Sequence, residues 1–182
     1  GETRGDLGGP NAGGHDAFVS KFDASGTLLW SQQWGTTMED RASSVSADAL
    51  GNVYIAGRTE GSFDDWDGFD AFVSKYDESG NLLWDRQFGA TSYDNAEGVS
   101  ADGHGNVYVG GSTGSPIHDA FISKYDSSGT SLWIQRQSGG DERGDWAGAR
   151  GVSADGLAGV YLTGTIGSDL LSEYDPFISK YD

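Results

Sequence analysis

A six-residue motif of the type Asp-Ala-Phe-Val-Ser-Lys occurs four times along this chain. Its copies, at Asp16–Lys21, Asp70–Lys75, Asp119–Lys124 and Asp175–Lys180, contain every lysine of the 182 residues. They begin 54, 49 and 56 residues apart. A unit of about fifty residues cannot bury its apolar faces alone and must stack on its neighbours. The sequence therefore predicts one array over residues 1–182, with units at approximately 1–40, 41–94, 95–147 and 148–182.

Each unit contains four segments with the character of β-strands. The first is Ala42–Asp48, Ala96–Asp102 or Ala149–Asp155; the second is Val53–Gly57, Val107–Gly111 or Val160–Gly164; the third is the lysine motif; and the fourth carries Leu28–Trp30, Leu82–Trp84 or Leu132–Trp133. β-Branched and aromatic residues dominate these segments, which are about five to eight residues long, as strands are. No helical periodicity extends beyond a few positions. We therefore predict an all-β chain.

Two of the connections in each unit have the chemistry of tight turns. The third and fourth segments are joined at Asp23–Gly26, Asp77–Gly80 and Asp126–Gly129, and the first and second at Asp48–Asn52 and Asp102–Asn106. An Asp side chain can cap its own turn, and Gly adopts a positive φ without steric cost. We therefore interpret the recurring aspartates as structural rather than catalytic.

The third segment is apolar on both of its faces. Phe72 and Tyr76 alternate with Ala71 and Val73, which indicates a strand that is covered on both sides. A four-stranded antiparallel unit covered on both faces by copies of itself is a β-propeller blade. The small residues of the first segment suit the crowded inner strand of such a blade, and the tryptophans of the fourth suit the wide outer strand.

The number of strands bears on whether the propeller can close. The chain holds about thirteen strands, which is three four-stranded blades and one extra strand. A closed ring usually needs at least four blades. Its opening residues, Gly1–Gly5, align with Gly57–Gly61, which follow a second strand, and it stops after a third strand. We therefore expect the blades to be part of a larger propeller, or to be completed by another chain or a further copy.

The repeats resemble the bacterial β-propeller repeats of the SBBP family. That pattern is Asp-Ala-Phe-Val-x-Lys-Tyr-Asp-x-x-Gly-Asn-Leu-Leu-Trp followed by Gly-Asn-Val-Tyr-Val, and Asp70–Trp84 and Gly105–Val109 match it closely. NHL repeats and quinoprotein-type propellers share parts of it more distantly. Ser131, Ala158-Gly159 and Pro176 depart from the pattern. The resemblance implies a propeller fold and a secreted, extracellular or cell-surface location, and it implies no catalytic residues.

Composition narrows the function classes. The net charge is −17, from 28 acidic and 11 basic residues, and this charge disfavours binding to nucleic acids or anionic membranes. No segment approaches the ~20 apolar residues of a membrane span, so no membrane insertion is expected. Cys is absent, and no nucleophile elbow, P-loop or dinucleotide motif occurs. His15, His104 and His118 lack a recurring catalytic setting, and the lysines are expected to pair with acids such as Asp16 or Asp23.

The remaining connections differ between repeats and should share one face of the blades. Binding residues are often found on variable loops that a rigid scaffold positions, so we expect function on this face. In one of them, Asp65, Asp67 and Asp70 surround a Gly and are candidate ligands for Ca²⁺, the alternative being a solvated acidic loop. Trp66, and Trp146 beside Asp145, are candidates for stacking on a sugar. The alternative for both tryptophans is that they fold back on the blade edge.

Together these features predict a non-enzymatic binding or scaffold module of a secreted or cell-surface protein. Its variable loops would recognise a protein or glycan partner on one propeller face. The alternative is a propeller-type hydrolase or lyase that acts on glycans through acidic loop residues. Carboxylates converging on the propeller axis would favour the enzyme, and loops diverging into a broad patch would favour the binding module.

Overall fold

The computed structural model describes residues 1–182 apart from 61–67, 90–92, 115–117, 140–144, 158 and 169–172. Within those residues the chain forms four antiparallel sheets and no helix. That part of the chain therefore contains no helix long and apolar enough to cross a membrane. The predicted all-β fold of propeller blades is confirmed.

We refer to the four sheets as the first to the fourth blade. The first blade contains β1 (Glu2–Thr3), β2 (Asp16–Phe22) and β3 (Leu28–Trp34); the second contains β4 (Asp40–Ala47), β5 (Val53–Thr59), β6 (Asp70–Tyr76) and β7 (Leu82–Phe88); the third contains β8 (Asn95–Ala101), β9 (Val107–Thr113), β10 (Asp119–Tyr125) and β11 (Ser131–Gln137); and the fourth contains β12 (Asp145–Ala154), β13 (Val160–Ser168) and β14 (Glu173–Tyr181).

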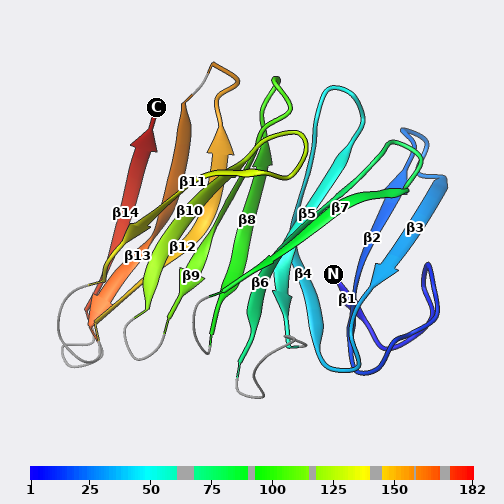
Figure 1. Cartoon of the computed structure of the whole chain (residues 1–182), viewed down its shortest axis with the longest axis horizontal. Helices are drawn as coiled ribbons and strands as arrows, with labels where there is room; N and C mark the ends of the chain where they lie inside the picture. The colour runs from blue at the N-terminus through cyan, green and yellow to red at the C-terminus, as the bar shows by residue number, and fades with distance from the viewer. Residues whose placement is uncertain (61–67, 90–92, 115–117, 140–144, 158, 169–172) are drawn as a thin grey trace.

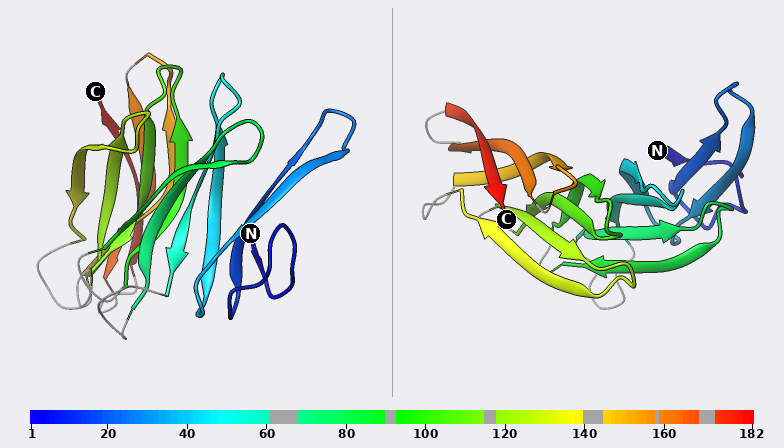
Figure 2. Two further views of the ribbon diagram at one scale, coloured as in Figure 1. Left: turned by 45° about the vertical axis from the view of Figure 1, so that its right-hand side comes forward. Right: turned by 90° about the horizontal axis from the view of Figure 1, so that it is seen from above.

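The blades stand side by side in an open arc (Figures 1 and 2). Strands β4, β8 and β12 lie on its concave side, whereas β7 and β11 lie on the convex side. Neighbouring blades meet through these inner strands, because β4 contacts β8 and β8 contacts β12. The prediction that the segment of small residues forms the inner strand is therefore confirmed.

Two strand boundaries differ from the sequence prediction. The chain opens with β1, whose pairing of Thr3 with Asp16 repeats that of Thr59 with Asp70 in the second blade. The first residues therefore complete a second strand rather than follow one, and the part of the chain that the structure describes holds fourteen strands, against the predicted thirteen or so. Strand β12 begins at Asp145, within a segment predicted to be a loop, because its pairing with β13 continues as far as Ser168.

The main core lies between the second and third blades. Tyr54, Val73 and Trp84 of the second blade pack with Val99 and Phe121 of the third. Strand β6 is buried on both faces, as predicted.

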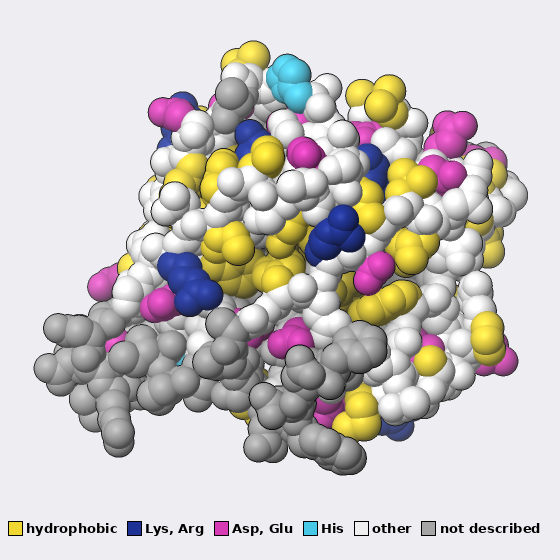
Figure 3. All heavy atoms as spheres, in the orientation of Figure 1, with side chains coloured by type: hydrophobic (Ala, Val, Ile, Leu, Met, Phe, Trp, Pro, Cys, Tyr) yellow, Lys and Arg dark blue, Asp and Glu magenta, His cyan; other side chains and the backbone are white. Residues whose placement is uncertain are grey.

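The outer strands are less well covered than predicted. Leu82 and Leu83 on β7, and Leu132 on β11, are about half exposed, and hydrophobic side chains are visible across the convex surface (Figure 3). The blades diverge toward this rim, so the next blade does not reach all of the outer strand.

The first and second blades each bind a turn of the following blade through a lysine and a tryptophan. Lys21 Nζ and Trp30 Nε1 donate to the carbonyl oxygen of Glu78 at 2.9 and 3.0 Å. Lys75 Nζ and Trp84 Nε1 donate to that of Ser127 at 3.2 and 3.1 Å. For Lys21 and Lys75 the predicted pairing with acids is wrong, because each lysine donates to a carbonyl oxygen in the turn of the following blade. Lys180 does pair with an acid, Asp182, at 3.1 Å.

The turns themselves form as predicted. Asp77 Oδ1 accepts the backbone N–H groups of Ser79 and Asn81 at 2.9 and 2.8 Å, and Gly80 has a φ of 87°. The Asn81 side chain donates to the same carboxylate at 2.8 Å. These hydrogen bonds, that of the Asn81 side chain above all, hold the pKa of Asp77 below its ordinary value.

Candidate functional site

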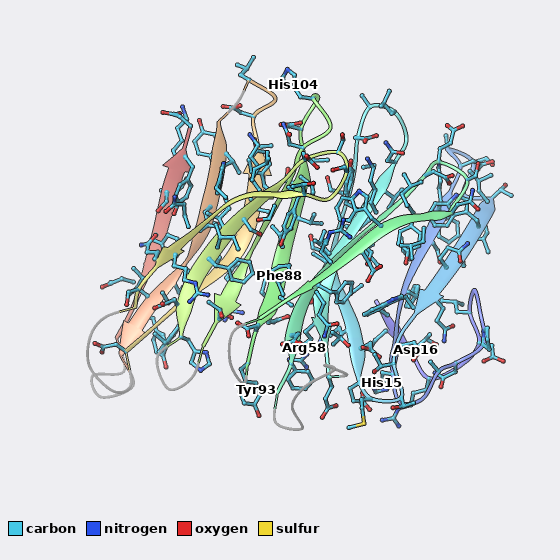
Figure 4. All side chains as sticks on the ribbon, in the orientation of Figure 1. His15, Asp16, Arg58, Phe88, Tyr93 and His104 are labelled. Atoms are coloured by element: carbon cyan, nitrogen blue, oxygen red, sulfur yellow. The ribbon has the colours of Figure 1, made fainter. Side chains whose placement is uncertain are left out.

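The two ends of the blades differ in character. The turns that repeat lie at one end, marked by His104, whereas His15, Asp16 and Tyr93 lie toward the opposite end (Figure 4). The connections at that second end join β3 to β4, β5 to β6 and β7 to β8, and differ in sequence between repeats. We call this end the variable face.

The predicted calcium ligands are only partly within the described residues. Asp65 and Asp67, and with them Trp66, lie outside that part. Asp70 begins β6, and its Oδ2 accepts a hydrogen bond from Gln87 Nε2 at 2.9 Å. Within the described residues, no three His, Asp or Glu side chains gather as metal ligands would. Asp70 thus has a structural partner, and its role in binding metal stays a prediction.

Trp146 and Asp145 lie in strand β12 rather than in a loop, and both are half-buried. The Trp146 ring packs against Tyr174, with the centroids 5.6 Å apart and the planes tilted by 55°. Its backbone pairs with Gly167 in β13 and forms a parallel bridge with His118 of the third blade. The structure therefore supports the alternative in which Trp146 folds onto its own blade.

A hollow of about 170 Å³ opens at the variable face between the second and third blades. It is lined by Arg58, Phe69, Tyr93, Asp94, Asn95, Ser112 and His118. The Arg58 guanidinium lies over the Phe69 ring, 4.4 Å from its centroid, and the Phe69 and Tyr93 rings are 5.9 Å apart. The Tyr93 side chain is 52 % exposed. We call this the junction hollow.

A second hollow, of about 280 Å³, adjoins it on the inner strands, and we call it the axial hollow. It is lined by Gly1, Glu2, Arg41, Ala42, Ser43, Arg58, Asn95 and Glu97. Arg58 and Asn95 line both hollows. Nearby ion pairs join Arg41 Nε to Glu2 at 3.9 Å and Arg150 Nη1 to Glu97 at 3.7 Å. These pairs are largely exposed and contribute little to stability.

A β-bulge recurs at one position of all three inner strands. The register shifts between Ala42 and Ser44, between Ala96 and Gly98, and between Ala149 and Gly151. The extra residue is Ser43, Glu97 or Arg150. The flanking alanines recur, whereas the extra residue differs in each blade. A bulge changes the direction of the side chain it carries. A different side chain at this position therefore changes the chemistry beside the axial hollow without changing the strand.

The sequence carries a signal for these bulges in its recurring glycines. Gly57, Gly111 and Gly164 lie opposite the bulges, at the end of each predicted second strand. A Cβ on Gly57 would overlap the carbonyl oxygen of Arg41, and one on Gly111 would overlap that of Asn95. Only glycine permits so close an approach of two backbones. The three glycines were visible in the sequence, but they looked like ordinary strand ends.

Within the described residues, one side-chain atom of Asn95 has no hydrogen-bond partner and Arg58 has no ion-pair partner. Asn95 Nδ2 donates to Glu97 Oε1 at 2.6 Å, while Asn95 Oδ1 is buried without a hydrogen-bond partner. Arg58 forms no ion pair within the described residues. Sequence reasoning missed both, along with Phe69 and Tyr93, because the four residues come from three separate segments, which precede or form parts of β5, β6 and β8.

The buried carboxylates at the variable face are held inside the blades. Asp16 Oδ2 accepts from the Ala12 N–H and from Gln33 Nε2, both at 2.8 Å. Asp40 accepts from the Thr36 N–H at 2.6 Å and from the Thr59 hydroxyl. Burial raises the pKa of Asp40, and the neighbouring Asp16 raises it further. Neither carboxylate is exposed, so neither is placed to act on a bound molecule.

Comparison with known proteins agrees with this architecture. Residues 29–64 and 83–118 each match the SBBP family model, described as a beta-propeller repeat. The chain is also similar to the regulatory protein FlaEY of Caulobacter vibrioides, with 27 % identity over 121 residues. That alignment covers 60 % of this chain and only 13 % of FlaEY. The chain therefore corresponds to a small part of this relative.

Proposed function

We propose that this chain, which carries SBBP β-propeller repeats, is a recognition module that binds its partner at the variable face and has no catalytic activity of its own. One observation carries the proposal. At the junction of the second and third blades, an arginine and two aromatic rings line an open hollow. The opposite end repeats two kinds of Asp-capped, hydrogen-bonded turn in successive blades.

The blades that form this hollow are held together by hydrogen bonds and by a buried core. The lysine and tryptophan of the first and second blades bind the turn of the following blade, and the core between the second and third blades is buried. Loops on such a frame can change without loss of the fold. The description of FlaEY as a regulatory protein fits a module that acts by binding.

The partner in this proposal is a glycan or a protein encountered outside the cell or at its surface. The net charge of −17 repels nucleic acids and anionic membranes. Exposed aromatic rings beside polar groups are typical of surfaces that bind sugars and proteins. The resemblance to SBBP repeats supports the extracellular location.

Further blades are a second kind of partner. Ile178 on β14 is 70 % exposed, whereas Val73 and Ile122 at the same repeat position are fully buried beside the following blade. An apolar strand face of this kind is normally covered. A further blade would cover Ile178 as the third blade covers Val73. It could come from a longer parent chain or from another copy of this one.

The alternative of a glycan hydrolase or lyase lacks a specific observation in its favour. Such enzymes present carboxyl groups to both sides of the bond they break. Asp16 and Asp40 are instead buried and hold amide and hydroxyl groups of their own blades. This arrangement supports the non-enzymatic proposal.

A binding screen of the 182-residue chain against glycans and extracellular proteins tests the proposal. Tyr93→Ala and Arg58→Gln should weaken binding of any partner found. His104→Ala, on the end of repeated turns, should leave binding unchanged. Binding that resists both variable-face variants, or turnover of a bound glycan, would contradict the proposal, as would a screen in which nothing binds.

A further inference from the structure

Arg58 is unusual among the charged residues of this acidic chain. The sequence has 28 acidic residues, and Arg41 and Arg150 nearby both pair with a Glu. Arg58 instead rests on the Phe69 ring, which fixes the plane of its guanidinium. Within the described residues it forms no ion pair. An oriented guanidinium that has no carboxylate partner among the described residues can receive one from a ligand, through two parallel hydrogen bonds.

Asn95 supplies the complementary group. Its Nδ2 donates to Glu97, and this bond fixes the amide orientation and leaves Oδ1 as a buried acceptor without a donor. A buried acceptor without a donor destabilises the protein, and a hydroxyl group of a ligand that donates to it would remove that effect. Because Asn95 and Arg58 line the same two hollows, one ligand can contact both residues, and a shift of the Asn95 side chain brings its buried Oδ1 within reach of that ligand.

Tyr93 adds an apolar surface beside these two polar groups. Its half-exposed ring packs against Phe69 at the edge of the junction hollow. Aromatic rings bind the C–H faces of sugar rings while polar groups at the rim bind the hydroxyls. Ser112 and His118 line the same hollow and add further polar atoms.

We propose, as an extension of the proposed function, that the junction and axial hollows bind a carboxylated sugar of the uronic-acid class. The sugar carboxylate pairs with Arg58, a sugar hydroxyl donates to Asn95 Oδ1, and the ring stacks on Tyr93. An acidic peptide would satisfy Arg58 but brings several charges toward a surface of net charge −17. Long-range repulsion therefore favours a single uronate over such a peptide.

Calorimetric titration with the methyl glycosides of galacturonic and glucuronic acid, which carry one carboxylate each, compared in each case with the methyl ester, tests this proposal. Esterification removes the charge and retains the ring and its hydroxyls. The native chain should bind at least one acid about tenfold more tightly than its ester. Arg58→Gln should abolish this preference, and Arg58→Lys should retain part of it because a lysine keeps the charge without the fork geometry. Tyr93→Ala should weaken acid and ester alike.

Arg136→Gln is the matched control. Arg136 is an exposed arginine on the outer strand β11, so its loss changes the net charge equally and should leave the preference intact. Melting curves of all variants establish that they fold.

Three results would overturn the inference: no binding of either acid, equal binding of acid and ester, or a preference that survives Arg58→Gln. Binding of poly-glutamate in place of the sugars, dependent on Arg58, would also overturn it. The proposed function would survive that last result, because a variable-face partner would still have been found.

Discussion

Replacing Trp84 with Phe tests whether the repeated tryptophan stabilises the array by binding the next blade. Trp84 is almost fully buried, and its Nε1 donates to the carbonyl oxygen of Ser127 in the third blade at 3.1 Å. Its ring also lies against Gly129 of the same turn, where a Cβ would come within 2.7 Å of it. Phe keeps an aromatic ring in this place but has no donor and is smaller.

The expected loss has two parts. Removing one hydrogen bond between neutral groups costs about 1 kcal/mol, and Lys75 still donates to the same oxygen, so that oxygen is not left without a donor. The smaller ring leaves a space beside Gly129, which costs about 1 kcal/mol more. We therefore expect Trp84→Phe to lower the free energy of unfolding by about 2 kcal/mol.

Trp133 provides a control at the same repeat position. It lies in the third blade, packs on Tyr108 and Tyr181, and its Nε1 has no acceptor within the described residues. Trp133→Phe should therefore cost only its packing, about 1 kcal/mol.

Urea denaturation followed by far-ultraviolet circular dichroism measures both losses without depending on tryptophan fluorescence. Equal losses for Trp84→Phe and Trp133→Phe would show that the bond to the next blade contributes nothing. The reasoning about the repeat motif would then be wrong.

Three further predictions concern the turns and the acidic loop. Gly129→Ala should destabilise more than Gly26→Ala in thermal melts, because both residues have a positive φ, of 79° and 83°, but only Gly129 packs on a tryptophan. Equal effects would contradict this. The pKa of Asp77 is held below its ordinary value, chiefly by the Asn81 side chain, so its contribution to stability is present above the unfolded pKa and is lost as the pH falls through the folded pKa. Asp77→Ala should therefore lower stability at pH 7 and weaken the further loss on acidification, as measured by melting at a series of pH values. If Asp65 and Asp67 bind Ca²⁺, the melting temperature should rise with Ca²⁺ concentration; coincident curves in excess Ca²⁺ and in chelator would remove that prediction.

The blade was predictable because its determinants are local and repeated. Alternation along Asp70–Tyr76 indicated a strand buried on both faces, and that strand is so buried. The turn at Asp77–Gly80 followed from an Asp that caps it and a Gly that adopts positive φ. The fourfold repeat of one pattern predicted that the units stack on one another, although no individual contact between units could be predicted.

The candidate site was not predictable in the same way. The aromatic residues chosen from the sequence were those in acidic loops, yet Trp146 packs on its own blade. Phe69 and Tyr93, which line the junction hollow, looked like ordinary residues of two unrelated connections. Asn95 gave no sign that its carbonyl oxygen would be buried without a donor.

The sequence by itself thus determined the strands, the turns and the order of the blades, because period-2 alternation and turn chemistry act over a few residues. Tertiary structure decided where Arg58, Phe69, Tyr93 and Asn95 lie. They are separated along the chain and meet only because neighbouring blades stack with β4 against β8. A contact between blades depends on the relative placement of two units, and no pattern within one unit contains that information.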